Sequence, residues 1–136
     1  MRVLVTGASG LIGSALGDAL FARGDDVVGL SRDPGRARGA NPRVVWHRWE
    51  PTLERPDPVA FEGVDAVVNL VGERIDQRWD DEVKRRIIDT RRQATHNLVQ
   101  AIEALERPPR VLVSQSAVGY YGDRGSEDKL RALANP

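Results

Sequence analysis

The chain has 136 residues, which suits one domain with a single hydrophobic core, since domains hold about 100 to 200 residues. Apolar residues make up 40% and charged residues 29%, with 20 basic side chains against 20 acidic ones, so disorder and a nucleic-acid-binding surface are not favoured. The absence of cysteine excludes disulfides and thiolate sites, two separated histidines argue against a zinc cluster, and the reducing cytoplasm is the expected compartment. Residues 1–20 begin like a signal peptide, but glycines and hydroxyl residues interrupt them too often for a membrane span.

Short apolar runs alternate with segments of helical periodicity along the first part of the chain. Residues 3–5 predict a buried strand that ends at a glycine turn. Apolar residues then recur at helical spacing from Leu11 to Leu20, and Gly24 is placed as a helix C-cap. Residues 27–30 predict the second strand. The following loop, residues 31–42, is rich in Arg, Gly, Asp and Pro and is expected to lack regular structure.

The same alternation continues through the second part. A third strand is predicted over residues 44–49, and the prolines after it leave room only for a short helical turn before a fourth strand over 66–70. Asp80 opens a long helix, which ends at two prolines before a fifth strand over 111–113. The buried stripe of this helix is predicted to comprise Val83, Ile87, Ala94, Leu98, Ile102 and Leu105.

These elements predict an α/β fold. The strands are nearly all apolar, which is typical of a parallel sheet covered on both faces by helices. Right-handed crossovers then favour a Rossmann-like, doubly wound sheet with strand order 3-2-1-4-5. Residues 1–122 are assigned to this domain. The polar segment 123–136 is predicted to hold a short helix from an N-cap at Ser126 through Ala134.

A glycine pattern, TGASGLIG, lies where the first strand turns into the first helix. Gly7 allows the sharp turn, Gly10 lets backbone N–H groups approach a pyrophosphate, and Gly13 permits close helix–strand packing. The spacing is G-x-x-G-x-x-G, one residue longer than the G-x-G-x-x-G fingerprint, and no Gly-Lys-Ser/Thr follows, which excludes a P-loop. A turn without a ligand is the alternative. The predicted cofactor-binding residues here are Gly7, Ser9, Gly10, Leu11, Ile12 and Gly13.

The end of the second strand indicates which dinucleotide is bound. Enzymes of this architecture that prefer NAD usually place an acid there to accept the ribose hydroxyls. This chain has Ser31 and Arg32 instead, and a guanidinium suits a 2′-phosphate, so NADP(H) is favoured over NAD(H). Asp33, one residue later, keeps NAD(H) open. Arg36 and Arg38 either assist the phosphate or are merely solvated.

Two more strand ends carry candidate site residues. Leu70, Val71 and Gly72 follow the fourth strand, and the small Gly72 would let the backbone lie against the nicotinamide-side ribose. Ser116 lies in a hydroxyl-rich stretch after the fifth strand. Because ligands of open α/β sheets bind at the carboxyl ends of the strands, beside the point where the strand order reverses, all these segments are expected to meet at one site.

The motifs TGASGLIG, NLVG and SQSAVGYYG, in this order, resemble the extended short-chain dehydrogenase/reductase superfamily. Within it, NLVGE, RW at 78–79, Lys84, TR at 90–91 and SAVGYYG are similar to the atypical epimerase-like subfamily, over residues 1 to about 125. The resemblance implies NADP(H) binding through the three glycines, Arg32 and the tip of the fourth strand. It also implies that Ser116 hydrogen-bonds the oxygen of a small-molecule substrate.

The catalytic pair of that superfamily, Tyr-x-x-x-Lys, is absent, because Arg124 and Gly125 stand four residues after Tyr120 and Tyr121. The length also leaves no room for the C-terminal strands and substrate region of such enzymes. We therefore expect the NADP(H)-binding portion of an epimerase- or reductase-like oxidoreductase, inactive alone, as a fragment or a stand-alone module. The alternative is a non-catalytic nucleotide-binding or partner-binding module, including a homodimer that buries the apolar sheet edge left by the absent strands.

Overall fold

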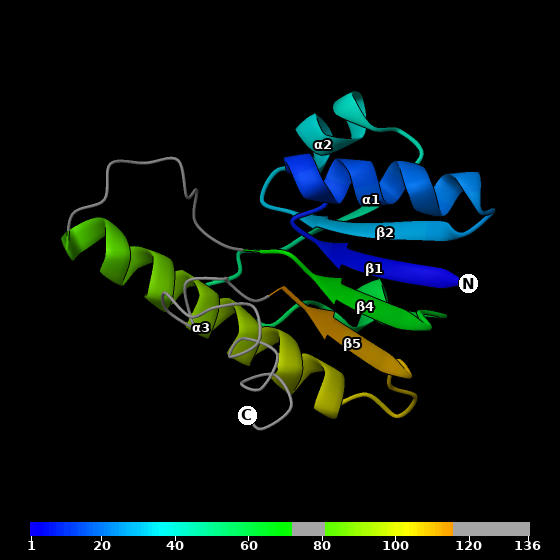
Figure 1. Cartoon of the computed structure of the whole chain (residues 1–136). Helices are drawn as coiled ribbons and strands as arrows, with labels where there is room; N and C mark the ends of the chain where they lie inside the picture. Colours follow the sequence, from blue (N-terminus) through cyan, green and yellow to red (C-terminus); the bar gives the residue numbers. More distant parts are fainter. Residues whose placement is uncertain (72–80, 116–136) are drawn as a thin grey trace, which may run out of the picture.

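The computed structural model describes residues 1–71 and 81–115 of the chain. The strands in these residues form one parallel sheet in the order β3-β2-β1-β4-β5 (Figure 1). This order confirms the predicted Rossmann-like, doubly wound fold. The elements are β1 (Arg2–Thr6), α1 (Leu11–Ala22), β2 (Asp26–Ser31), α2 (Pro34–Ala40), β3 (Val45–Arg48), the 3₁₀ turn η1 (Pro58–Phe61), β4 (Ala66–Asn69), α3 (Asp81–Glu103) and β5 (Val111–Ser114).

Helices lie on both faces of the sheet, α1 and α2 on one side and α3 on the other (Figure 1). Successive strand residues point to opposite faces, so β1 contributes to two separate cores. Val3 and Val5 pack in the cluster that includes Leu20 of α1 and Ala37 of α2. Leu4 packs in the cluster that includes Leu98 of α3. Each predicted strand is found to within one residue at either end, and η1 confirms the predicted short helical turn.

The prediction that residues 31–42 lack regular structure is wrong, because they contain α2. The side chain of Asp33 accepts a hydrogen bond from the backbone N–H of Arg36 at 3.1 Å, which caps the helix. Pro34 occupies the first turn, where its missing N–H and fixed φ cost nothing. Ala37 is buried against the sheet. One cap, one proline and one buried alanine thus stabilise a helix in a stretch whose composition indicates a loop.

Only the later part of the apolar stripe of α1 faces the core. Leu20 is buried and Leu16 is partly buried in the same cluster, whereas Leu11 and Ile12 are 91% and 55% exposed. Gly13 and Gly17 are buried as well. The C-cap prediction is confirmed, since Gly24 follows the helix with a φ of +86°.

The covering of the sheet is uneven on the side of α3. Val83, Ile87, Ala94 and Leu98 are buried as predicted, together with Thr90 and Ala101. Ile102 and Leu105 are only partly buried, and Leu105 follows the last helical residue. All residues of β5 are exposed, contrary to the expectation of a sheet covered on both faces throughout. Residue 80 and the 123–136 segment lie outside the described residues. Within the described part, no helix has the length and apolarity to cross a bilayer.

Candidate functional site

The turn between β1 and α1 depends on its glycines for its shape. Gly7 has a φ of +69°, and a Cβ there would lie 3.0 Å from the carbonyl oxygen of Leu70. The N–H of Gly10 donates to the carbonyl oxygen of Gly7 at 3.1 Å, which closes the turn. A Cβ on Gly13 would overlap that same carbonyl and lie 2.7 Å from Cα of Ala8. The predicted conformational roles of Gly7 and Gly13 are therefore present in the structure.

The amino end of α1 emerges from this turn with its backbone donors available. The N-cap residue is Gly10, so no side chain of that residue accepts from the first N–H groups of the helix. The first turn also carries no acidic side chain, and the positive end of the helix dipole lies there without a protein anion in that turn. Such an end favours an anionic ligand.

A cavity of about 540 Å³ opens beside the turn, at the carboxyl ends of β1, β2 and β3. Its volume is in the range of small-molecule and cofactor sites, about 300 to 1,000 Å³. Of the residues predicted to bind the cofactor, five contribute to its wall: Gly7, Ser9, Ser31, Arg32 and Val71. The wall is completed by Leu30, Asp33, Arg36, Ala37, Ala40, Trp49 and Pro51.

The other predicted site residues lie elsewhere. Gly10, Leu11, Ile12 and Gly13 belong to the turn and the first turn of α1 and do not line the cavity, and neither does Leu70. Gly72 and Ser116 lie outside the described residues, as do the Tyr-Gly segments after β5.

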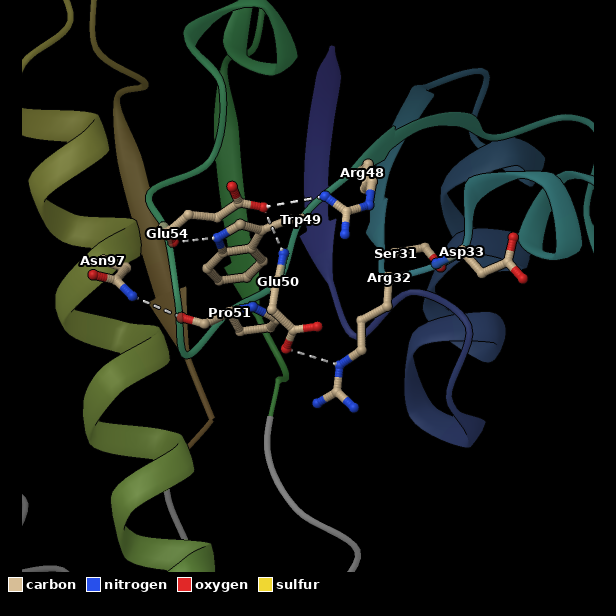
Figure 2. A network of polar contacts seen from close by, with 9 residues as sticks. All are labelled: Ser31, Arg32, Asp33, Arg48, Trp49, Glu50, Pro51, Glu54 and Asn97. Carbon is tan, nitrogen blue, oxygen red and sulfur yellow. Dashed lines mark hydrogen bonds and ion pairs between the residues drawn. The ribbon is translucent and has the colours of Figure 1, made fainter.

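Arg32 stands at the cavity wall directly after β2 and is 65% exposed (Figure 2). Its Nε lies 3.4 Å from Oε1 of Glu50. The neighbouring acid, Asp33, has its carboxylate at the N-cap of α2, and its N–H donates to Oγ of Ser31 at 3.1 Å. Arg36 lines the cavity and Arg38 does not. The positively charged side chains of the wall are thus Arg32 and Arg36, while the acid of the wall, Asp33, caps a helix.

The turn after β3 forms a wall of the cavity that the sequence analysis missed. Trp49 is 2% exposed, and its indole N–H donates to the carbonyl oxygen of Glu54 at 2.8 Å (Figure 2). Nδ2 of Asn97, on α3, donates to the carbonyl oxygen of Pro51 at 2.7 Å. The predicted strand order could have indicated this wall. Because β3 lies next to β2, the carboxyl end of β3 must lie beside Arg32.

A buried polar network joins β1 to β4 at the same edge of the sheet. The hydroxyl of Thr6, which is fully buried, donates to Oδ1 of Asn69 at 2.6 Å. It accepts from the N–H groups of Leu70 at 3.0 Å and Val71 at 3.2 Å. Nδ2 of Asn69 donates in turn to Oγ1 of Thr95 and to Oγ of Ser114, both at 3.3 Å. The network fixes the backbone of the β4 tip, at which Val71 reaches the cavity.

The sequence matches a known protein family over nearly its whole length. The chain matches the model of the NAD dependent epimerase/dehydratase family over residues 3–135. It belongs to this family. The membership confirms the predicted resemblance, and the match includes the glycine turn and all of the sheet but its first residue, Arg2.

Members of the family from distant organisms are similar to the chain. The human epimerase family protein SDR39U1 is 37% identical over 127 residues, which cover 89% of this chain and 38% of the relative. The epimerase family protein Mb2239 of Mycobacterium bovis is 39% identical over 122 residues, with the same coverage. The chain therefore spans about 38% of the length of these epimerase family relatives.

Solved structures agree with the fold. A structure of human SDR39U1 (isoform 2) with NADPH is 34% identical, has a TM-score of 0.69 and is matched over 89% of this chain and 38% of its own. A UDP-glucuronic acid 4-epimerase from Bacillus cereus, in complex with UDP-glucuronic acid and NAD, has a TM-score of 0.70 at 22% identity and covers 93% of this chain and 43% of its own. At 22% identity, the similarity to the UDP-glucuronic acid 4-epimerase supports only the fold of this chain.

Proposed function

We propose that this chain is the NADP(H)-binding portion of an epimerase- or reductase-like oxidoreductase. The observation that carries the proposal is the open cavity of about 540 Å³ beside the glycine turn, with Arg32 on its wall. Had side chains filled the bend, no dinucleotide could rest there. Family membership supports the cofactor class, and the human relative solved with NADPH supports the phosphorylated form.

In this proposal the pyrophosphate lies against the backbone of the glycine turn. The N–H groups of Leu11 and Ile12, at the amino end of α1, would donate to the phosphate oxygens, while that of Gly10 closes the turn. Gly10 lets the backbone approach closely, and Gly7 and Gly13 keep the turn tight. The exposed side chains of Leu11 and Ile12 then cover apolar surface of the bound cofactor.

The adenosine half occupies the cavity, and Arg32 with Ser31 binds the 2′-phosphate. A guanidinium presents a planar set of donors that matches phosphate oxygens. The acid that would otherwise accept ribose hydroxyls, Asp33, caps α2 instead, which supports NADP(H) over NAD(H). Arg36, on the same wall, adds positive charge.

Leu70, Val71 and Gly72, which follow β4, would hold the ribose on the nicotinamide side through their backbone. When bound, this ring supplies or accepts a hydride. Ser116 hydrogen-bonds the oxygen of the carbonyl or alcohol substrate, which stays unspecified beyond that class. Because the chain lacks Tyr-x-x-x-Lys and spans about 38% of its relatives, we expect no turnover from it alone.

Nucleotide titration tests the proposal. NADPH fluorescence should change on addition of the protein, and the absence of binding up to millimolar concentration would remove the cofactor role altogether. Arg32→Ala should weaken NADPH binding by roughly ten- to hundredfold, since hydrogen bonds to charged groups contribute about 1.5 to 3 kcal/mol, while NADH binding changes little. Equal losses for both nucleotides would refute the 2′-phosphate assignment. A carbonyl-reduction screen with Ser116→Ala then separates an active enzyme from a binding module.

The exposed β5 favours a second candidate, a partner-binding module that pairs with a second copy of itself. Among the described strands β5 pairs only with β4, and Val111, Leu112 and Val113 are 49%, 38% and 54% exposed. Apolar edge strands of this kind pair readily with other chains. Light scattering should then give a dimer that Val113→Lys dissociates. A monomer at all concentrations would exclude this role.

A further inference from the structure

The turn after β3 places a second charged residue beside the proposed 2′-phosphate site. Oε1 of Glu50 lies 3.4 Å from Nε of Arg32, and Figure 2 shows the two side chains directed toward each other. Glu50 is 25% exposed, against 65% for Arg32. The carboxylate is therefore the more enclosed partner and the guanidinium the more solvated one.

The backbone of Glu50 is held in place from several directions. Its N–H donates to Oε1 of Glu54 at 3.1 Å, and its carbonyl oxygen accepts from the N–H groups of Leu53 at 3.1 Å and Glu54 at 3.2 Å. The preceding residue, Trp49, donates its N–H to the carbonyl oxygen of Ser31 at 2.9 Å, which continues the β2–β3 ladder. The backbone of Glu50 is thus held in place next to the long side chain of Arg32, for which the described residues offer no other ion pair.

The geometry of the contact leaves the phosphate-binding end of Arg32 available. A guanidinium carries five N–H donors on three nitrogens, and Nε is the nitrogen that forms the ion pair with Glu50. In Figure 2 the two terminal nitrogens point away from Glu50. These nitrogens form the fork that can bind two oxygens of one phosphate. Glu50 and a phosphate can therefore hold different edges of the same guanidinium.

We infer that Glu50 is a positioning residue for nucleotide discrimination, which holds Arg32 by Nε so that its terminal nitrogens receive the 2′-phosphate. The inference rests on the proposed binding of NADP(H) in this cavity. As an exposed ion pair the contact adds little to folding stability. Its effect is on binding, because a ligand that finds the arginine already oriented need not immobilise it, and immobilising such a side chain costs about two- to tenfold in affinity.

Two opposing effects of the carboxylate can be separated by experiment. Its negative charge also repels a phosphate, so removing it could strengthen NADPH binding instead of weakening it. Since the charge is compensated by Arg32 at 3.4 Å, we expect orientation to dominate. Glu50→Gln should weaken NADPH roughly two- to tenfold and change NADH by less than twofold.

A double-mutant cycle tests the pairing directly. Dissociation constants for NADPH and NADH are measured by calorimetry on the wild type, Glu50→Gln, Arg32→Ala and the double variant. Glu50→Gln should have no further effect once Arg32 is absent. Tighter NADPH binding, equal losses for both nucleotides, or the same loss in the Arg32→Ala background would each overturn the inference.

Two further variants sharpen the test. Glu54→Gln removes the same charge from the same turn and keeps an oxygen for the N–H of Glu50, so its NADPH affinity should match the wild type. Arg32→Lys keeps the charge but has a single nitrogen for both partners, so its NADPH preference should fall toward that of Arg32→Ala. A lysine variant with wild-type preference would also overturn the inference. Wild-type protein that binds neither nucleotide would instead refute the proposed function itself.

Discussion

Two glycines on the buried face of α1 should respond in opposite directions to the same substitution. A Cβ on Gly13 would overlap the carbonyl of Gly7, whereas a Cβ on Gly17, one turn later, meets nothing within 4 Å. Alanine at either site gains up to about 0.5 to 1 kcal/mol in helix stability. At Gly13 this gain is outweighed by an overlap that costs about 1 to 3 kcal/mol, because the atoms that must move are backbone. We therefore expect Gly17→Ala to stabilise the protein and Gly13→Ala to destabilise it, with a separation of about 1 to 3 kcal/mol.

Urea unfolding followed by circular dichroism measures this difference. With a denaturant slope of about 1 to 3 kcal/mol per molar, the midpoints of the two variants should differ by roughly 1 M. Because the displacement of α1 also widens the glycine turn, Gly13→Ala should weaken NADPH binding and Gly17→Ala should not. Equal stability changes in the two variants would show that Gly13 does not lie as close to the backbone of Gly7 and Ala8 as the structure has it.

Three further predictions concern the carboxyl edge of the sheet and the start of α1. Thr6→Val keeps the shape but leaves the N–H of Val71 without its acceptor and Oδ1 of Asn69 without its donor, whereas the N–H of Leu70 keeps the carbonyl oxygen of Thr6. Urea unfolding should therefore show a loss of about 2 to 4 kcal/mol. Thr6→Ser retains the hydroxyl, and equal losses for the two variants would contradict the network. Leu11→Ala should change stability by under about 0.5 kcal/mol, because the side chain is 91% exposed, yet weaken NADPH binding; unchanged affinity would remove Leu11 from the site. Asn97→Ala should cost about 1 kcal/mol through the lost bond to Pro51, and an unchanged urea midpoint would argue against that bond.

The sheet could be predicted because its sequence pattern has a single physical origin. A strand buried on both faces must be apolar at successive positions, and this holds from Val3 to Val5 and again from Ala66 to Val68. Short strands separated by helices have few ways to connect, and right-handed crossovers leave the observed order. The glycine turn followed from the same context, since its position between a strand and a helix gives the pattern its meaning.

Hydrophobic periodicity was misleading at the amino end of α1. Leu11 and Ile12 belong to the apolar stripe but are exposed, whereas Gly13, which carries no apolar side chain, is buried. A similar limit applies to α2, where a cap at Asp33 and a proline in the first turn decided the conformation against a loop-like composition. Local hydrogen bonds of this kind are worth about 1 kcal/mol each and leave little trace in composition.

The cavity wall after β3 was missed for a different reason, since it depends on contacts between distant segments. Trp49 and Pro51 carry no motif, and their place follows from the ladder with β2 and from Asn97 on α3. Arg32, by contrast, was predicted as a site residue from its position alone, and it lines the cavity. A single strand end can be inferred from sequence, whereas the surface that closes over it cannot.

The strand order explains why the cavity and the polar network occupy opposite sides of β1. The chain leaves β1 toward α1 on one face and leaves β4 toward the face that carries α3, so the two connections diverge and the carboxyl edge between them stays open. On the side of β4 this opening is bridged by Thr6 and Asn69, whose polar groups satisfy one another. On the side of β2 it is left as the cavity. A ligand entering there contacts Arg32 and the glycine turn, while the buried hydroxyl of Thr6 is already committed to protein partners and serves to hold the β4 tip.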